Sequence, residues 1–99
     1  MADTMRTIEK TAIAIFSPLK PDSHVSADYD RPADVLYISF LNSPPEEADF
    51  GRGYGDYIIR FKNDGSVVGV TVINAMEHYE KGFADKPTIL REPVLIHFA

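Results

Sequence analysis

The chain has 99 residues, 44% of them hydrophobic, and a formal net charge of −5. This length fits one domain with a modest core, and the hydrophobic content is that of a folded globular protein. The acidic balance, without any basic block, opposes contact with phosphate backbones, so general nucleic-acid binding is not expected. We therefore interpret residues 1–99 as a single domain.

The composition and the start of the chain exclude further classes. There is no cysteine, which removes disulfides, thiolate nucleophiles and zinc–cysteine sites. No apolar run approaches the roughly 20 residues of a membrane-spanning helix, so no membrane association is expected. Asp3 stands early, and no apolar segment precedes a small-residue cleavage site, unlike a secretory signal peptide. These features predict a cytoplasmic protein without a cofactor.

The first 22 residues fit two structures. Apolar residues recur at helical spacing behind the candidate cap Asp3, namely Met5, Ile8, Ala12 and Ile15. Residues 11–16, however, are rich in β-branched side chains, which favours a strand. We favour the strand without excluding the helix, and Pro18 and Pro21 end any regular structure there.

Residues 24–41 predict a β-hairpin with a four-residue loop at 31–34. This loop places Asp30 opposite Val35, and the carboxylate of Asp30 can then accept a hydrogen bond from the backbone of Ala33. The pairs that follow gather apolar side chains on one face: Tyr29 with Leu36, Ala27 with Ile38 and Val25 with Phe40.

Residues 57–74 predict a second hairpin, turning at Asp64-Gly65. Asp-Gly between apolar runs is typical of a two-residue type I′ turn, because both central residues need positive φ. A three-residue turn would shift the register by one and mix the two faces, so the alternation favours the shorter turn. The apolar pairs are then Phe61 with Val68, Ile59 with Val70 and Tyr57 with Val72. Arg60 and Lys62 would be exposed, and Gly69 indicates a bulge or a close approach.

The remaining segments complete the predicted fold. Residues 42–56 form a connection of unusual length, which is either a mobile functional loop or contains an edge strand near 48–52. Residues 75–81 predict a short helix capped by Gly82, and the alternation at 94–98 predicts a last strand. The fold class is α+β, mainly β: an antiparallel β-meander of two hairpins, with one short helix and the terminal segments packed on it.

Two linked motifs distinguish this chain. The first is Tyr29-Asp30, three residues, then Asp34-Val35-Leu36-Tyr37-Ile38, and the second is Asp64-Gly65-Ser66-Val67-Val68-Gly69-Val70. Together they resemble a bacterial family catalogued as domain of unknown function twenty-two eighty-three, with residues 24–76 as the family-like core and 1–23 and 77–99 as extensions. The family has no established activity to carry over. Its members look like small stand-alone chains, some encoded beside a second small protein, which implies a partner, as in antitoxin-like pairs.

No metal site is predicted. The aspartates around the first loop fail the calcium-loop pattern, since the sixth and twelfth positions counted from Asp28 are Ala33 and Ser39 instead of glycine and glutamate. Their expected role is turn capping. The three histidines, His24, His78 and His97, share no metal-ligand spacing.

The candidate ligand-binding residues are Arg52, Tyr54 and Arg60. A cation and an aromatic ring within the glycine-rich run 51–55 can touch an anionic or aromatic ligand, although the run lacks the ending of a phosphate-binding loop. The candidate catalytic residues are His78, as acid–base, and Glu77 beside it.

We interpret the chain as a non-enzymatic protein-interaction module that self-associates as a homodimer. One short helix cannot cover both faces of the sheet, and the second face still carries Val35, Tyr37, Leu41, Ile58, Val67 and Ile73. Open edge strands and such a face invite a second copy. The alternative is a small acid–base hydrolase using His78 with Glu77.

Overall fold

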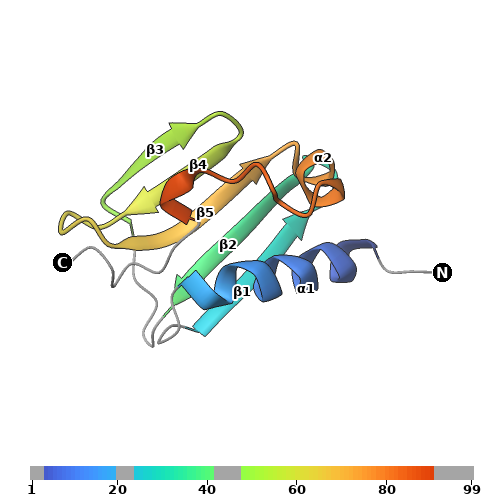
Figure 1. Ribbon diagram of the computed structural model, residues 1–99, viewed down its shortest axis with the longest axis horizontal. Coiled ribbons are helices and arrows are strands. Elements are labelled where there is room, and N and C mark those ends of the chain that lie inside the picture. Colours follow the sequence, from blue (N-terminus) through green and yellow to red (C-terminus); the bar gives the residue numbers. More distant parts are fainter. Residues whose placement is uncertain (1–3, 20–23, 42–47, 91–99) are drawn as a thin grey trace.

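The computed structural model describes residues 4–19, 24–41 and 48–90, without the side chains of residues 4–6 and 41. Five antiparallel strands form one open sheet in the order β1-β2-β5-β4-β3. They are β1 (His24–Asp30), β2 (Val35–Leu41), β3 (Phe50–Tyr54), β4 (Tyr57–Phe61) and β5 (Val67–Ile73). The helices are α1 (Thr4–Phe16), η1 (Ser17–Leu19), α2 (Ala75–Glu80) and η2 (Thr88–Leu90) (Figure 1). None of these helices is long and apolar enough to span a membrane.

The mainly β class is confirmed, but the strand order is not that of a meander. β2 pairs with β5, and β3 occupies the far edge beside β4. Residues 67–70 of β5 are all buried, and such a continuous apolar run is typical of a strand in the interior of a sheet. β3 is glycine-rich and largely exposed, so it suits the edge. β3 lies within the long connection 42–56, for which an edge strand was one of the two predicted alternatives. The strand predicted for residues 94–98 lies outside the described part of the chain.

The hairpin of β1 and β2 confirms the predicted register from Asp30 opposite Val35 through Val25 opposite Phe40. The backbone N–H of Ala33 donates to Oδ1 of Asp30 at 3.4 Å, as expected from the loop sequence. Period-2 alternation and a four-residue loop were therefore sufficient to define this hairpin.

The hairpin of β4 and β5 has a three-residue turn, so the predicted two-residue turn is wrong. The N–H of Lys62 donates to the carbonyl of Ser66 at 2.9 Å, and Gly65 takes a φ of 90° whereas Asp64 does not have positive φ. A type I turn followed by a glycine in the left-handed region is the usual three-residue loop. This three-residue loop uses the same Asp-Gly pair as a two-residue type I′ turn, so the sequence alone did not distinguish the two turn types.

A β-bulge corrects the register that this turn shifts. Phe61 pairs with Val67 instead of Val68, and beyond the bulge Ile59 pairs with Val70 as predicted. The extra residue on β5 restores the alternation along the rest of the hairpin. Val67, expected on the second face, consequently packs in the core.

Gly69, next to the bulge, is explained by close approach. A Cβ at this position would meet the guanidinium of Arg60 and lie 2.9 Å from the carbonyl oxygen of Ile38. Arg60 and Lys62 are half-buried, so the prediction that they are exposed is wrong. The absence of a side chain at Gly69 is what lets the arginine lie flat across the sheet.

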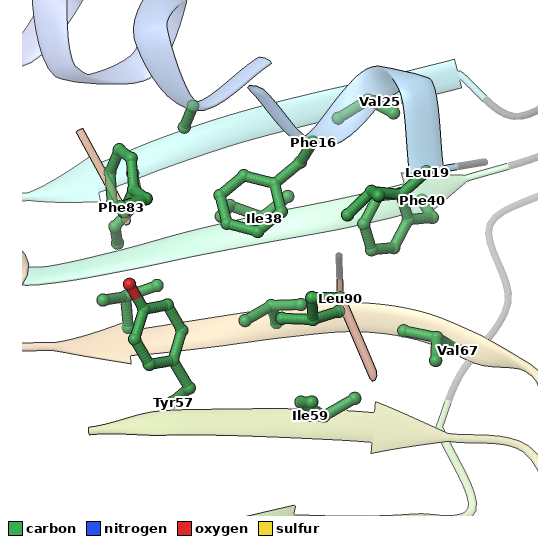
Figure 2. Packing of buried hydrophobic residues seen from close by; sticks show 14 of the residues in the cluster. Phe16, Leu19, Val25, Ile38, Phe40, Tyr57, Ile59, Val67, Phe83 and Leu90 are labelled. Carbon is green, nitrogen blue, oxygen red and sulfur yellow. The ribbon is translucent and has the colours of Figure 1, made fainter. Parts of the chain in front are cut away.

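The core fills one face of the sheet (Figure 2). α1 contributes Ile8, Ala12 and Phe16, which are fully buried. The ring of Phe83 meets that of Phe16 edge to face, with centroids 5.7 Å apart, and Leu90 of η2 packs into the same cluster. Helices from both ends of the described chain thus cover the same side of the sheet.

The strand favoured for residues 11–16 is wrong, because these residues belong to α1. Ile8, Ala12 and Phe16 follow one another at four-residue spacing, which places them on one face of a helix. Burying that face against the sheet outweighs the β propensity of the intervening branched residues.

Asp34, in the loop between β1 and β2, caps α2. Its carbonyl accepts the N–H of Ala75 at 3.0 Å, and its Oδ1 accepts the N–H of Met76 at 2.9 Å and the hydroxyl of Tyr29 at 2.6 Å. Burial, and then the hydrogen bond to Asp34, raises the pKa of Tyr29 to about 12. Asn74 precedes the helix but makes no side-chain cap, so α2 depends on the first hairpin for its start.

We expect Val70→Asp to lower the free energy of unfolding by at least about 3 kcal/mol, because it buries a charge without a partner. Thr71→Asp is the matched control, since Thr71 is the next residue of β5 and points to the other face. Urea unfolding followed by circular dichroism measures both. Equal midpoints for the two variants would contradict the assignment of faces.

We expect Asp34→Ala to destabilise the protein by about 1–3 kcal/mol, since it leaves buried donors unpaired and strains a position at φ 54°. Asp34→Asn keeps an acceptor and tolerates this φ, so it should lose clearly less. Urea unfolding separates the two, and an alanine variant as stable as the asparagine variant would argue against the cap.

Candidate functional site

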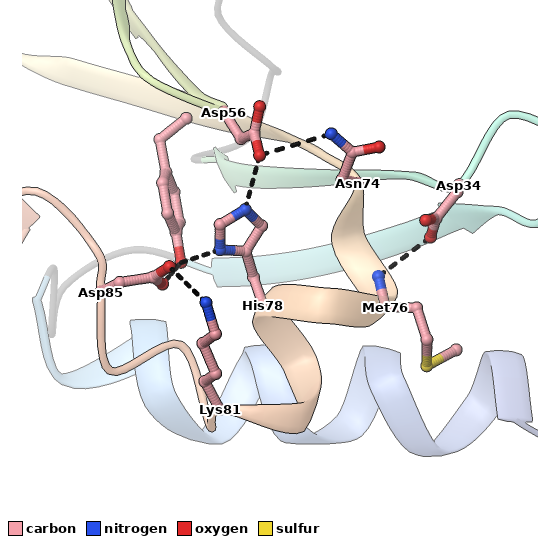
Figure 3. A network of polar contacts seen from close by, with 8 residues as sticks. Asp34, Asp56, Asn74, Met76, His78, Lys81 and Asp85 are labelled. Atoms are coloured by element: carbon pink, nitrogen blue, oxygen red, sulfur yellow. Dashed lines mark hydrogen bonds and ion pairs between the residues drawn. The ribbon is translucent and has the colours of Figure 1, made fainter.

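The candidate site is built around His78, which is 7% exposed on α2. Its Nδ1 lies 2.7 Å from Oδ2 of Asp85, and its Nε2 lies 2.9 Å from Oδ2 of Asp56 (Figure 3). Asp56 comes from the turn between β3 and β4, and Asp85 from the segment that follows α2. One imidazole ring therefore joins three separate parts of the chain.

Two tight turns bring the aspartates to the ring. Gly55, at φ 61°, lets the chain reverse between β3 and β4 and leaves Asp56 at the tip. The carbonyl of Asp56 accepts the N–H of Ile73 at 2.8 Å, which fixes the tip to the end of β5. This anchoring limits where the Asp56 carboxylate can lie.

The second turn ends α2 in a Schellman motif. The N–H of Gly82 donates to the carbonyl of Tyr79 at 2.8 Å, and that of Phe83 to the carbonyl of His78 at 2.8 Å. The predicted cap at Gly82 is thus confirmed. Burial of Phe83 in the core then fixes the path of the chain toward Asp85.

The two carboxylates determine the charge of the ring. An ionised carboxylate only accepts hydrogen bonds, so two such partners require both ring nitrogens to donate. Burial lowers the pKa of His78, but the hydrogen bonds and negative charges of Asp56 and Asp85 outweigh it, and the pKa is raised overall. Two carboxylates on one ring thus favour its imidazolium form.

The aspartates have further partners. The hydrogen bonds from His78 and Asn74 lower the pKa of Asp56. Burial alone would raise the pKa of Asp85, but hydrogen bonds from Tyr57 and His78 lower it overall. The hydroxyl of Tyr57 donates to Oδ1 of Asp85 at 2.9 Å, and burial followed by this bond raises the pKa of Tyr57.

Two weaker contacts complete the network at its solvent side. Nδ2 of Asn74 lies 3.4 Å from Oδ2 of Asp56, and Nζ of Lys81 lies 3.9 Å from Oδ2 of Asp85. Because Lys81 is exposed, its ion pair adds little to stability.

The structure brings only some of the predicted site residues together. Glu77 is exposed beside the clamp, with a carboxylate oxygen within 4.8 Å of His78 and Asp56 ligand atoms. Arg52 and Tyr54 share the core-side face of edge strand β3, whereas Arg60 lies on the opposite face of the sheet. His24 is exposed on β1, and His97 lies outside the described residues.

Asp56 and Asp85 were missed in the sequence. Each lies in a turn, where an aspartate is ordinarily explained by capping, and they stand 29 positions apart. The available signals were the glycine turn before Asp56 and the cap at Gly82 that redirects the chain toward Asp85. Neither signal indicates that the two carboxylates converge on one ring.

These features define a class: a small, mainly β domain, with an open five-stranded sheet covered on one face and a histidine clamped by two aspartates beside it. A family model described as "Protein of unknown function (DUF2283)" matches residues 27–75, and the chain belongs to this family over those residues. No curated protein and no solved structure gives a significant match. The matched segment includes Asp34 and Asp56 but not His78 or Asp85, so the complete clamp extends beyond the family match.

The clamp predicts a definite pH dependence of stability. The raised pKa of His78 contributes stability that is complete below the ordinary value of 6.5 and is lost as pH rises through the folded-state pKa. The lowered pKa values of Asp56 and Asp85 contribute stability that is present above 3.8 and lost as pH falls through theirs. The clamp is therefore fully formed between these two values.

We expect the urea midpoint to fall as pH rises beyond this window, and this fall should disappear in His78→Gln. His24→Gln is the control, because His24 is exposed on β1. Midpoints measured from pH 4 to 9 test this, and an unchanged alkaline slope in His78→Gln would contradict an imidazolium clamp.

Proposed function

We propose that the chain is a protein-interaction module that associates with a second copy of itself through the uncovered face of the sheet. This face is defined by the residues that alternate with the core positions, including Asp28, Val35, Tyr37, Ile58 and Ile73. The main support for this proposal is that, within the described residues, every helix with core contacts packs on the opposite face of the sheet (Figure 1).

The uncovered face combines exposed apolar groups with unusual flatness. Tyr37 is 41% exposed and Ile73 37%, on adjacent strands β2 and β5. Gly69 of β5 and Gly51 of β3 contribute no side chains to it. Exposed apolar groups on a surface with few protruding side chains suit packing of one sheet on another, at about 10 Å separation.

Charge placement favours a second copy as the occupant. Asp28 lies on β1, and the guanidinium of Arg60 reaches from β4 over Gly69 of β5. β2 lies between β1 and β5, so a two-fold axis along β2 places β1 of each copy over β5 of the other. This rotation brings Asp28 of each copy near Arg60 of its partner and places the two Tyr37 rings about the axis.

The hydrogen bonding of Arg60 also favours a carboxylate partner such as Asp28 of the second copy. Its Nε is buried and has no hydrogen-bond partner within the described residues. A carboxylate from another chain would compensate the charge of the guanidinium. A patch limited to about three strands is smaller than a standard interface, so association in the micromolar range is expected.

The hydrolase alternative has less support from the geometry. A general base needs a free ring nitrogen, and both nitrogens of His78 are engaged by aspartates. Glu77 stands beside the ring on the solvent side and is not the group that orients it.

We expect the protein to be a dimer at high micromolar concentration and Ile73→Lys to be monomeric there, because a charge is forced into the contact. Ile89→Lys is the matched control, since Ile89 is 38% exposed on η2, away from the uncovered face. Sedimentation equilibrium measures both. A wild-type protein that stays at the monomer mass would contradict the proposal, leaving another small protein or residues 91–99 of the chain as the cover.

The axis along β2 has its own test, in which two charge-reversed variants are mixed. Asp28→Lys alone and Arg60→Glu alone each create two repulsive pairs in a homodimer, so each should be monomeric. Mixed together, they restore two attractive pairs and should form a one-to-one heterodimer. Dimers of either single variant, or no association in the mixture, would contradict this arrangement.

A further inference from the structure

We propose that Asp56, Glu77 and His78 form a binding site for a divalent transition-metal ion, with Asp85 orienting the histidine. The site lies at the start of α2, where the turn between β3 and β4 meets the helix. This inference is independent of self-association, because the uncovered face of the sheet supplies none of its three ligands.

The first argument is the spacing of the ligand atoms. Two donor atoms bound to one ion at about 2.1 Å stand about 3 Å apart in an octahedral site and about 3.4 Å apart in a tetrahedral site, the usual geometry of zinc. Nε2 of His78 and Oδ2 of Asp56 are separated by 2.9 Å. A carboxylate oxygen of Glu77 lies within 4.8 Å of both atoms, and this exposed side chain can approach by rotating.

The second argument is the partner on the far side of the ring. Histidines that bind metal through Nε2 generally donate Nδ1–H to a carboxylate, which fixes the tautomer and the direction of the lone pair. Asp85 accepts from Nδ1 at 2.7 Å and is itself held by Tyr57. This outer partner comes from a segment that supplies no ligand to the ion.

The third argument is local charge. Three carboxylates, those of Asp56, Glu77 and Asp85, surround one imidazole, and the exposed Lys81 pairs with Asp85 at 3.9 Å. A divalent ion at this point would offset the negative charge of the carboxylates.

The donor set indicates the class of ion. One imidazole nitrogen and two carboxylate oxygens suit zinc or manganese better than the all-oxygen sites of calcium and magnesium. The side chain of Asp56 is 35% exposed, so solvent reaches the site and water can complete the coordination.

Isothermal titration calorimetry with zinc chloride near neutral pH tests the proposal on the full chain. We expect one zinc ion to bind per chain and to release a proton, so the heat should depend on the ionisation enthalpy of the buffer. Glu77→Gln should weaken binding by at least about tenfold. Since Glu77 is exposed and has no role in the clamp, this variant should fold normally.

Glu80→Gln is the matched control, because it removes the same charge from the same short helix but lies outside the three-ligand group. It should bind zinc as the unaltered chain does. Carbon–proton NMR signals of the His78 ring should shift with zinc, while those of His24 should not. No saturable binding, or equal weakening in Glu77→Gln and Glu80→Gln, would overturn the site.

Discussion

Burial of the central strand β5 is the constraint on which the rest of the structure depends. Residues 67–70 are all buried, as is typical of a strand in the interior of a sheet with its core face covered. β2 and β4 pair with the two edges of β5, so β3 lies at the edge of the sheet and the strand order is not that of a simple meander. α1 and the segment after α2 supply the cover from opposite ends of the described chain. Both helical segments lie on one side, so within the described residues no helix covers the other side of β5.

The same requirement explains the polar contacts. A six-residue helix such as α2 is far too short to be stable by itself, so it must be held by tertiary contacts. Asp34 holds its start, and the Schellman motif and Phe83 hold its end. His78 lies between these anchors and faces the turn of Asp56. The contacts of His78 with Asp56 and Asp85 thus follow from holding a short helix across the end of the sheet, and they bring the side chains of the proposed metal site together.

The sequence predicted the parts of the fold that depend on local pattern. The first hairpin was correct to the residue, because alternation and loop length both demand the pairing of Asp30 with Val35. The second failed at its turn, at the pair next to it and in the exposure of Arg60 and Lys62. Asp64-Gly65 suits two turn types, and the compensating bulge at Val68 leaves the distal pairs unchanged. The segment 11–16 failed because its helical face becomes favourable only once a sheet is present to cover it.

Prediction of the site was limited by distance along the chain. His78 was identified as a candidate because histidine is rare here, but its partners were not, since Asp56 and Asp85 lie 22 and 7 positions away. Glu77, the partner suggested by adjacency, is on the solvent side, as expected of neighbours on a helix. Local sequence can nominate a titratable residue, whereas its charge state is decided by groups that only the tertiary fold brings together.

The uncovered face and the clamp are physically joined at the end of β5. Ile73 lies on that face, and its N–H donates at 2.8 Å to the carbonyl of Asp56, whose carboxylate holds His78. Asn74, the next residue, reaches the same carboxylate at 3.4 Å. The proposed contact with a second copy at Ile73 and the proposed ion at Asp56 would therefore act on the same turn. Linkage makes such coupling reciprocal: whatever factor an ion applies to association, association applies to the affinity for the ion. The proposed contact surface and the polar site thus share one backbone hydrogen bond, from the N–H of Ile73 to the carbonyl of Asp56.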